Sequence, residues 1–206
     1  RFLSTAMNAI QITKFGGPEV LQLAKGVAVP KPGPGQVLVQ VKAAGVNPVD
    51  TYIREGQRGG NLPYIPGKDG AGIVAELGPN VTRSKPGDRV YFFLSSSGTY
   101  AEYCLVDEKC IAPLKEQLSF SQGASIGVPY YTAYRALVHK ANVKPGYTVL
   151  IHGASGAVGL ACCQIGRQLG CNIIGTAGTE DGMQLAKANG AKMVFNHRDK
   201  NYMDKI

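Results

Sequence analysis

The chain has 206 residues, of which 44% are hydrophobic and 17% charged, and its formal net charge is +8. This composition excludes a disordered chain, and no apolar run approaches the roughly 18 residues of a membrane-spanning helix. The positive charge is spread thinly, without a dense Lys/Arg block, so it favours an anionic ligand but is more typical of a solvated surface than of a nucleic-acid interface.

Roughly the first 120 residues predict a β-rich domain. Extended or alternating apolar patterns predict strands at residues 8–14, 20–29, 36–43, 70–77, 88–94 and 100–106. The pattern at 36–43 has a strict period of two and predicts a half-buried strand. The Pro- and Gly-rich stretch 30–35 is a loop, and a short helix is expected at 51–54. Such spacing favours a small barrel or sandwich.

After Ser119 the pattern changes to alternating helices and strands. We expect helices at 121–125, 130–140, 157–169 and 180–189, and strands at 148–151, 172–176 and 192–195. Gly170 and Gly190 follow two of these helices, as C-terminal caps do. From 148 onward the order is β-α-β-α-β, which is half of a doubly wound dinucleotide fold of about six strands. We therefore expect a fragment or a truncated isoform, or a fold completed from elsewhere.

The stretch 147–159, YTVLIHGASGAVG, carries the strongest functional signal. A buried strand, a G-x-x-G-x-x-G loop and a helix follow one another, so a pyrophosphate can rest on the helix N-terminus. Gly153 allows the tight turn, Gly156 lets the backbone approach the phosphates, and Gly159 lets the helix lie close to the strand. The alternative is a glycine-rich turn in an α/β protein without a ligand. The local order of elements favours the dinucleotide site.

Cysteine usage and the first residues bear on the compartment. The five cysteines form no disulfide-framework spacing and no C-x-x-C pair, which is typical of a reducing compartment and argues against a structural zinc site. We expect most of them to be small buried hydrophobes. Residues 1–6 precede Met7 and contain Arg, Ser and Thr but no acid. They are compatible with a mitochondrial transit-peptide tail, a cloning remnant or an untranslated-region read-through, and this choice stays open.

Motifs in a fixed order along residues 7–206 resemble those of the zinc-free medium-chain dehydrogenases/reductases, and among them the zeta-crystallin or NADPH:quinone oxidoreductase family. These motifs are FGGPEVL (15–21), GVNPVDTYIR (45–54), LPYIPGKDGAGIV (62–74), KPGDRVY (85–91), GTYAEY (98–103), GVPYYTAYRAL (127–137), HGASGAVGLACCQI (152–165), GTAGTEDG (175–182) and VFNHRD (194–199). The resemblance implies an α/β architecture: a GroES-like catalytic domain at 7–125, then a truncated Rossmann domain at 126–206 that binds NADPH.

Zinc-using relatives carry a Cys at the position of Asn47 and a Gly-His-Glu where this chain has Pro66-Gly67-Lys68-Asp69. Asn, Lys and a lone Asp cannot provide the three ligands of a catalytic zinc ion, so no metal site is expected. This argues against alcohol-dehydrogenase chemistry. It favours an acceptor whose conjugated system delocalises incoming charge, such as a quinone or an α,β-unsaturated carbonyl.

The resemblance also implies catalytic roles for three residues. Tyr52 is expected beside the nicotinamide ring, where it also binds the cofactor, or else is a half-buried tyrosine with a satisfied hydroxyl. Asn47 is expected near the quinone pocket, or else is a turn-forming Asn before proline. Thr132 is expected near the nicotinamide, or else caps a helix N-terminus. The pyrophosphate loop is assigned to Ser155, Gly156, Ala157 and Val158.

Cofactor choice depends on the end of the second predicted strand of the nucleotide fold. An NAD enzyme of this fold has an acid about 20 residues past the loop that holds the ribose 2′-hydroxyl. Here that place is the segment 176–179, which includes Gly178 and has no acid before Glu180. NADPH is therefore favoured, because no carboxylate there repels the 2′-phosphate. The resemblance adds His197 to the phosphate site, where a surface histidine is the alternative.

These inferences favour an NADPH-dependent quinone oxidoreductase in which, as the resemblance implies, quinones receive one electron at a time. The alternatives are an NADPH-dependent 2-alkenal double-bond reductase, a non-catalytic lens protein or a binder of AU-rich single-stranded RNA, and an inactive truncated form. The resemblance further implies a homo-tetramer, without membrane association, in the cytoplasm. Mitochondria are the alternative location if residues 1–6 are a transit-peptide remnant.

Overall fold

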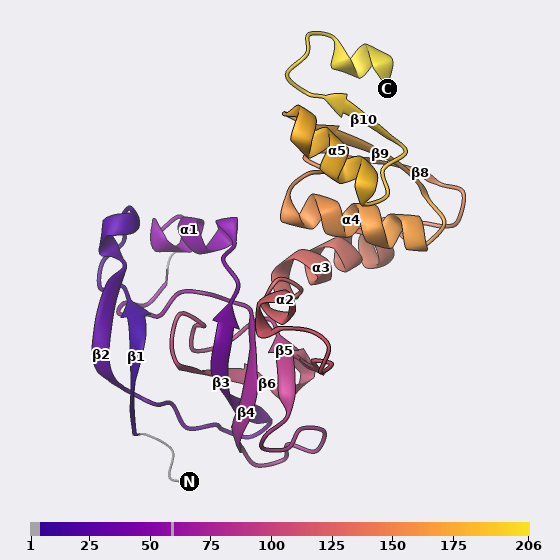
Figure 1. The fold of residues 1–206 in the computed structure, drawn as a ribbon. Helices are drawn as coiled ribbons and strands as arrows, with labels where there is room; N and C mark the ends of the chain where they lie inside the picture. Colours follow the sequence, from indigo (N-terminus) through magenta and orange to yellow (C-terminus); the bar gives the residue numbers. More distant parts are fainter. Residues whose placement is uncertain (1–4, 59) are drawn as a thin grey trace. The chain divides into compact units, whose positions relative to one another are not determined.

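The computed structural model describes residues 5–58 and 60–206. The chain divides into two compact units, the first ending at Val128 and the second beginning at Pro129 (Figure 1). Each unit has its own sheet and its own buried core. The two units are described separately below.

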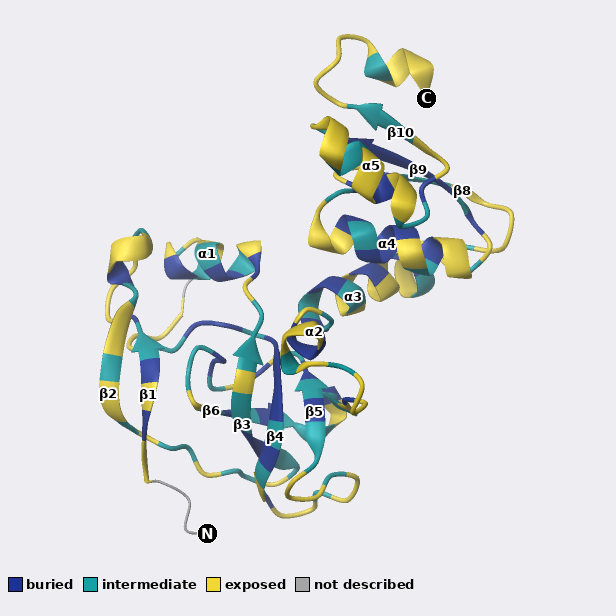
Figure 2. Ribbon diagram, viewed as in Figure 1, coloured by how far each residue is buried: buried dark blue, intermediate teal, exposed yellow. Residues whose placement is uncertain are grey.

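The first unit is built on an antiparallel five-stranded sheet with the strand order β6-β3-β4-β5-β7. Its strands are β3 (Gln36–Ala44), β4 (Gly70–Leu77), β5 (Arg89–Phe92), β6 (Tyr103–Asp107) and β7 (Ile111–Pro113). A separate antiparallel pair is formed by β1 (Ala6–Gln11) and β2 (Gln22–Ala28). The largest buried side chain of the unit, Phe92, lies in a core with valines of β3, β4 and β5. In Figure 2, β3 and β4 carry buried residues, whereas β2 is mostly exposed.

Short helices complete the first unit. They are η1 (Pro18–Val20), α1 (Pro48–Arg54), η2 (Glu108–Cys110) and α2 (Phe120–Ala124). Proline at the first position of α1 suits a helix start, because its missing N–H would have no intrahelical partner. At α2 the side chains of Ser119 and Gln122 each accept a hydrogen bond from the other residue's backbone N–H, at 3.1 and 2.8 Å. This capping box explains why the helix begins at Phe120.

The second unit has a parallel three-stranded sheet with the order β10-β9-β8. Its elements, counted from α3 at the unit boundary, are α3 (Gly127–Tyr134), the π-helix η3 (Arg135–Lys140), β8 (Thr148–Ile151), α4 (Ala157–Gln168), β9 (Asn172–Ala177), α5 (Glu180–Ala188), β10 (Met193–Asn196) and η4 (Tyr202–Lys205). The predicted β-α-β-α-β order is confirmed, and with it the α/β class with a Rossmann-like parallel sheet.

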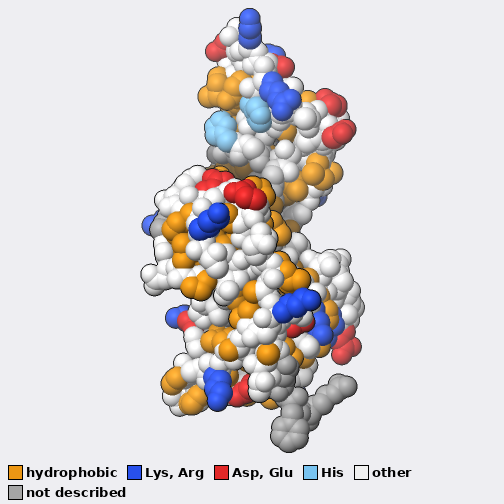
Figure 3. All heavy atoms as spheres, turned by 90° about the vertical axis from the view of Figure 1, so that its left-hand side faces the viewer, with side chains coloured by type: hydrophobic (Ala, Val, Ile, Leu, Met, Phe, Trp, Pro, Cys, Tyr) orange, Lys and Arg blue, Asp and Glu red, His pale blue; other side chains and the backbone are white. Residues whose placement is uncertain are grey.

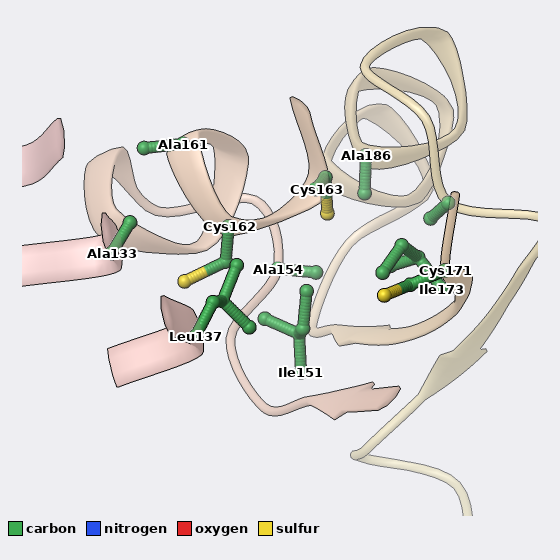
Figure 4. Close-up of a cluster of buried hydrophobic side chains, with 11 residues drawn as sticks. Ala133, Leu137, Ile151, Ala154, Ala161, Cys162, Cys163, Cys171, Ile173 and Ala186 are labelled. Carbon is green, nitrogen blue, oxygen red and sulfur yellow. The ribbon is translucent and has the colours of Figure 1, made fainter. Parts of the chain in front are cut away.

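Small side chains fill the core of the second unit. Figure 4 shows Cys162 and Cys163 of α4 together with Ile151 and Ile173 of the sheet and Leu137 of the π-helix. Gly166 allows α4 to approach β9, because a Cβ there would lie 2.5 Å from Cδ1 of Ile173. Burial of all five cysteines agrees with the prediction that they are core residues.

Several predicted elements differ in extent from those observed. The strand β7 was not predicted, and β6 begins at Tyr103 rather than Tyr100, because the amides of Thr99 and Tyr100 both bond the Pro66 carbonyl oxygen instead of a neighbouring strand. The predicted half-burial of β3 is wrong at its start. There Leu38, on the face of the strand opposite to that of Val37 and Val39, is as completely buried as they are, so both faces of this strand between β6 and β4 are covered at its start.

The predicted helix at 130–140 is two helices of different type. The α-helix α3 ends at Tyr134 and a π-helix continues to Lys140. Of the apolar positions that suggested the helix, Leu137 is buried but Tyr134 is 47% exposed. In the part of the chain that the structure describes, no helix is long and apolar enough to cross a membrane.

Candidate functional site

The glycine loop after β8 has the geometry expected of a phosphate cradle. Gly153 has φ +64°, a conformation that other residues rarely adopt, and its N–H donates to Oγ1 of Thr176 on β9. At Gly159 a Cβ would lie 2.3 Å from the Gly153 carbonyl oxygen, so only glycine lets α4 pack on this loop. At Gly156 the nearest atom to such a Cβ is 3.5 Å away. The space beside Gly156 is therefore open for a ligand.

The first turn of α4 faces this opening. Gly156 is the N-cap of α4, and Ala157 and Val158 are exposed in its first turn. The first amides of any α-helix lack intrahelical partners and carry the positive end of the helix dipole. Ser155, half-buried, precedes them. These four residues, predicted from the sequence as the pyrophosphate loop, thus form one continuous surface at the carboxyl end of β8.

A second group of polar residues lies at the carboxyl ends of β9 and β10. A Cβ built on Gly178 would be 2.8 Å from Nε2 of His197 and 3.1 Å from Nε of Arg198, so both side chains lie directly against this glycine. The backbone N–H of His197 donates to the Ala177 carbonyl oxygen at 3.0 Å, which keeps this residue beside the end of β9. Figure 3 shows histidine and basic side chains next to one another on a face of the second unit.

The glycine loop lies close to the segment after β9 that contains Gly178 and Thr179. A Cβ built on Gly182, in the first turn of α5, would lie 3.0 Å from both Oγ of Ser155 and Oγ1 of Thr179. Thr179 caps α5 by accepting a hydrogen bond from the Gly182 N–H at 3.1 Å. The predicted cofactor residues Ser155, Gly178 and His197 are therefore brought together at one edge of the parallel sheet.

In the first unit, Asn47 lies at the N-cap of α1 and is almost fully buried. Its Nδ2 donates to Oδ1 of Asp69 at 2.7 Å, and its backbone N–H donates to Oδ2 of Asp50 at 2.9 Å. The turn-forming role considered as the alternative is thus present in part, since Asn47 starts the helix. Tyr52, one helical turn later, is 43% exposed, and its place beside a nicotinamide stays a prediction.

Thr132 is exposed and lies inside α3, not at its N-terminus. The alternative that it caps a helix is therefore wrong, because a cap residue flanks the helix it serves. Its predicted place near a nicotinamide stays a prediction.

Two buried carboxyl groups were not predicted as site residues. Asp69 is fully buried and accepts hydrogen bonds from Asn47 Nδ2 and, at 2.6 Å, from the Val128 N–H. Burial raises the pKa of Asp69, and the nearby charge of Asp50 raises it further, whereas its hydrogen bonds oppose the shift. Burial likewise raises the pKa of Asp50. The Asn-x-x-Asp spacing at 47–50, a helix-start pattern, was the one local signal for Asp50.

Comparison with known proteins identifies the family. The model for the alcohol dehydrogenase GroES-like domain matches residues 33–116, and that for zinc-binding dehydrogenase matches residues 157–206. Human quinone oxidoreductase is 55% identical over 202 residues, which is 97% of this chain and 61% of that protein. This chain belongs to the quinone oxidoreductase family.

Solved structures of family members agree. Escherichia coli quinone oxidoreductase complexed with NADPH superposes with a TM-score of 0.88 at 36% identity, covering 96% of this chain and 61% of that one. The mycobacterial protein Rv1454c complexed with NADPH gives 0.87 at 35% identity, covering 96% and 61%. The chain thus spans about three fifths of the length of the family members it matches.

Because residues 157–206 match the zinc-binding dehydrogenase family, a zinc site has to be considered. At the positions where zinc-using relatives are expected to carry their ligands, this chain has Asn47, Lys68 and Asp69. The amide of Asn47 donates a hydrogen bond to the carboxylate of Asp69. An amide, an ammonium group and one carboxylate do not fit the His and Cys donors of zinc sites. Among the described residues, no group of three or more His, Cys, Asp or Glu side chains could hold a metal ion.

Proposed function

We propose that the protein is an NADPH-dependent quinone oxidoreductase. The observation that carries this proposal is the edge of the second unit where the glycine loop, Ser155 and the pair His197 and Arg198 lie together. The loop suits a pyrophosphate. The two basic residues beside Gly178 suit a 2′-phosphate, because no carboxylate precedes Glu180 there.

The names of the relatives support a quinone as the substrate. Proteins that are 54–55% identical to this chain are named quinone oxidoreductases. When bound, NADPH would supply hydride equivalents from its dihydronicotinamide ring. We propose that Tyr52 and Thr132 lie against that ring, that Asn47 helps to position the quinone, and that residues 7–125 and 126–206 are the catalytic and nucleotide-binding domains.

Further expectations from the resemblance stay predictions. They are one-electron transfer, a tetrameric assembly, cytoplasmic location and affinity for AU-rich RNA. The net charge of +8 is compatible with an anionic ligand such as RNA but is equally compatible with NADPH.

The test is a fluorescence titration with NADPH and with NADH, followed by assays of NADPH oxidation with an ortho-quinone and with a 2-alkenal. We expect NADPH to bind more tightly than NADH and the quinone to be reduced. Turnover of the alkenal alone would instead identify a double-bond reductase. If neither coenzyme binds, the proposal is wrong.

A further inference from the structure

Asp69 connects two segments of the first unit that are far apart in the sequence. It is fully buried, and each of its carboxylate oxygens accepts a hydrogen bond from a different segment. Oδ1 accepts from Nδ2 of Asn47, at the N-cap of α1, at 2.7 Å. Oδ2 accepts from the N–H of Val128, in the first turn of α3, at 2.6 Å. One side chain therefore links the start of α1 to the start of α3.

Two glycines pack against this carboxylate and leave it little freedom to move. A Cβ built on Gly45 would collide with Oδ1 of Asp69, and one built on Gly127 would lie 2.8 Å from Oδ2. The N–H of Gly45 also donates to the Asp69 carbonyl oxygen at 2.9 Å. Because backbone lies directly against both oxygens, the orientation of the carboxylate is set by its surroundings.

A purely structural role accounts for only one of the two oxygens. The first amides of a helix have no intrahelical partner and lie at the positive end of its dipole. By accepting the Val128 N–H, Oδ2 of Asp69 satisfies one of these amides and stabilises the start of α3. Oδ1 is not needed for this and faces the side chain of Asn47 instead.

The bond to Asp69 decides which way round the Asn47 amide lies. A carboxylate accepts hydrogen bonds and donates none, so the NH2 group of Asn47 must face Asp69 and its carbonyl oxygen must lie on the other side of the amide. The two ends of an asparagine amide have nearly the same shape, so packing alone distinguishes them poorly. The carboxylate therefore selects one of two orientations.

The helix α1 is also anchored at its other end, to the FGGPEVL segment. Nε of Arg54 donates to the Gly16 carbonyl oxygen at 3.0 Å, and the N–H of Gly16 donates to the Arg54 carbonyl oxygen at 3.1 Å. These bonds do not involve Asp69. Loss of the Asp69 carboxylate should therefore turn the Asn47 amide round rather than release the helix.

We propose that Asp69 is a positioning residue for quinone reduction and that it acts through Asn47. The inference rests on the proposed function, in which Asn47 helps to position the quinone. Asp69 is 0% exposed, so it touches neither substrate nor coenzyme itself. Its contribution is to hold the Asn47 amide in one orientation before the quinone binds, so that no binding energy is spent on orienting it.

The first test is Asp69→Asn, assayed with NADPH and 1,2-naphthoquinone. The carbonyl oxygen of the new amide can still accept the Val128 N–H, which cannot turn away because it belongs to the backbone. Its NH2 group then faces Asn47, whose own amide must turn round. We expect kcat/KM to fall roughly 10- to 100-fold and NADPH affinity to stay unchanged, because the glycine loop lies in the second unit. Asp107→Asn, which removes a surface carboxylate paired with Lys109, is the matched control and should behave as wild type.

A double-mutant cycle with Asn47→Ala separates positioning from support of the fold. If Asp69 acts through Asn47, Asp69→Asn should lower kcat/KM by no more than about twofold in the Asn47→Ala background, because the amide that it orients is absent. A residue that only supports the fold would cost the same factor in both backgrounds. Urea unfolding gives the folded fraction of each variant, to which the rates are normalised. Equal factors in the two backgrounds would overturn the inference.

The double variant Asn47→Asp with Asp69→Asn keeps the inference testable even if Asp69→Asn alone does not fold. The amide at position 69 can then donate to the carboxylate at position 47, while its carbonyl oxygen accepts the Val128 N–H. The urea midpoint should therefore return close to the wild-type value. By contrast, kcat/KM should stay roughly 10-fold or more below wild type, because no amide lies at position 47. Recovery of wild-type kcat/KM would contradict the proposal.

The NH2 signals of the Asn47 side chain provide a measurement that does not need turnover. In ¹H–¹⁵N spectra this pair of signals is identified by its loss in Asn47→Ala. It should move upfield in Asp69→Asn, because the hydrogen bond to a carboxylate is gone, and should not move in Asp107→Asn. Signals that stay in place in Asp69→Asn would overturn the inference. A wild type in which they respond as expected but the quinone is not reduced would overturn the proposed function alone.

Discussion

At the scale of single residues, Gly156 and Gly159 of the glycine loop are required for different physical reasons. A side chain at Gly159 would collide with the backbone of Gly153, which cannot move without dismantling the turn, whereas one at Gly156 would meet only ordinary contacts. Gly159 therefore supports the fold. Gly156 leaves the space beside it open, so we expect it to contribute to ligand binding rather than to stability.

We expect Gly159→Ala to destabilise the protein by about 1–3 kcal/mol, because the added methyl group overpacks a backbone contact. Gly156→Ala, the matched control, should cost less than about 1 kcal/mol, since alanine is only a poorer N-cap, yet should weaken NADPH binding. Denaturant unfolding and coenzyme titration measure the two effects. Equal loss of stability in both variants would contradict this division.

Arg198 is the residue at which coenzyme preference can be tested. Its Nε lies beside Gly178 and next to His197, and its side chain is exposed. Arg198→Gln should weaken NADPH binding by roughly fivefold, as expected for an exposed charge pair worth up to about 1 kcal/mol, and should leave NADH binding unchanged. Lys187→Gln, at the other end of α5, is the control. Equal weakening of both coenzymes would place the 2′-phosphate elsewhere.

At the scale of elements, caps decide where the helices begin. The helix α2 has only one and a half turns, so it depends on its capping box and on packing against β3, β4 and β5. Gly123 lets it lie close to the sheet, because a Cβ there would be 2.9 Å from Cβ of Ala71. A helix this short cannot be stable alone. Its cap and its docking face are therefore both needed.

We expect Ser119→Ala to cost about 0.5–2 kcal/mol in the free energy of unfolding, because Oγ no longer accepts the Gln122 N–H. Ser121→Ala, within the same helix and exposed, should change stability by no more than about 0.5 kcal/mol. Both are measured by urea unfolding. If the two variants lost the same stability, the loss would not come from the cap.

At the scale of the whole molecule, each unit encloses its own core and both cores contain cysteines. Cys104 and Cys110 lie in the first unit, and Cys162, Cys163 and Cys171 in the second. Burial raises the pKa of Cys104 to about 12 and that of Cys163 to about 11. Because the thiolate is the reactive form, these thiols report on unfolding of either unit.

The native protein should therefore react only slowly with an aromatic disulfide reagent at about pH 8, whereas all five thiols should react at once in guanidinium chloride. The reaction of a small free thiol in the same denaturant is the control. A thiol that reacts rapidly in the native protein would identify a unit that opens readily.

How far the fold was predictable depends on how local its signals are. The strand 148–151 and the helix that starts at Ala157 were predicted to the residue, since buried apolar runs and glycines mark them within a few positions. The strand β7 was missed because only three residues form it, and they are held by pairing with β5. The π-helix after Tyr134 was also missed, because a helical apolar pattern does not distinguish the two helix types.

The sequence by itself determined the order of elements, the glycine loop and the absence of an acid before Glu180, because each is encoded by neighbouring residues. Only the tertiary structure decided which distant groups meet. Strand pairing brings His197 and Arg198 against Gly178, and folding of the first unit brings Asp69 to Asn47 and the Tyr100 hydroxyl to Asp50. These contacts depend on sheet order and burial, which no local pattern specifies.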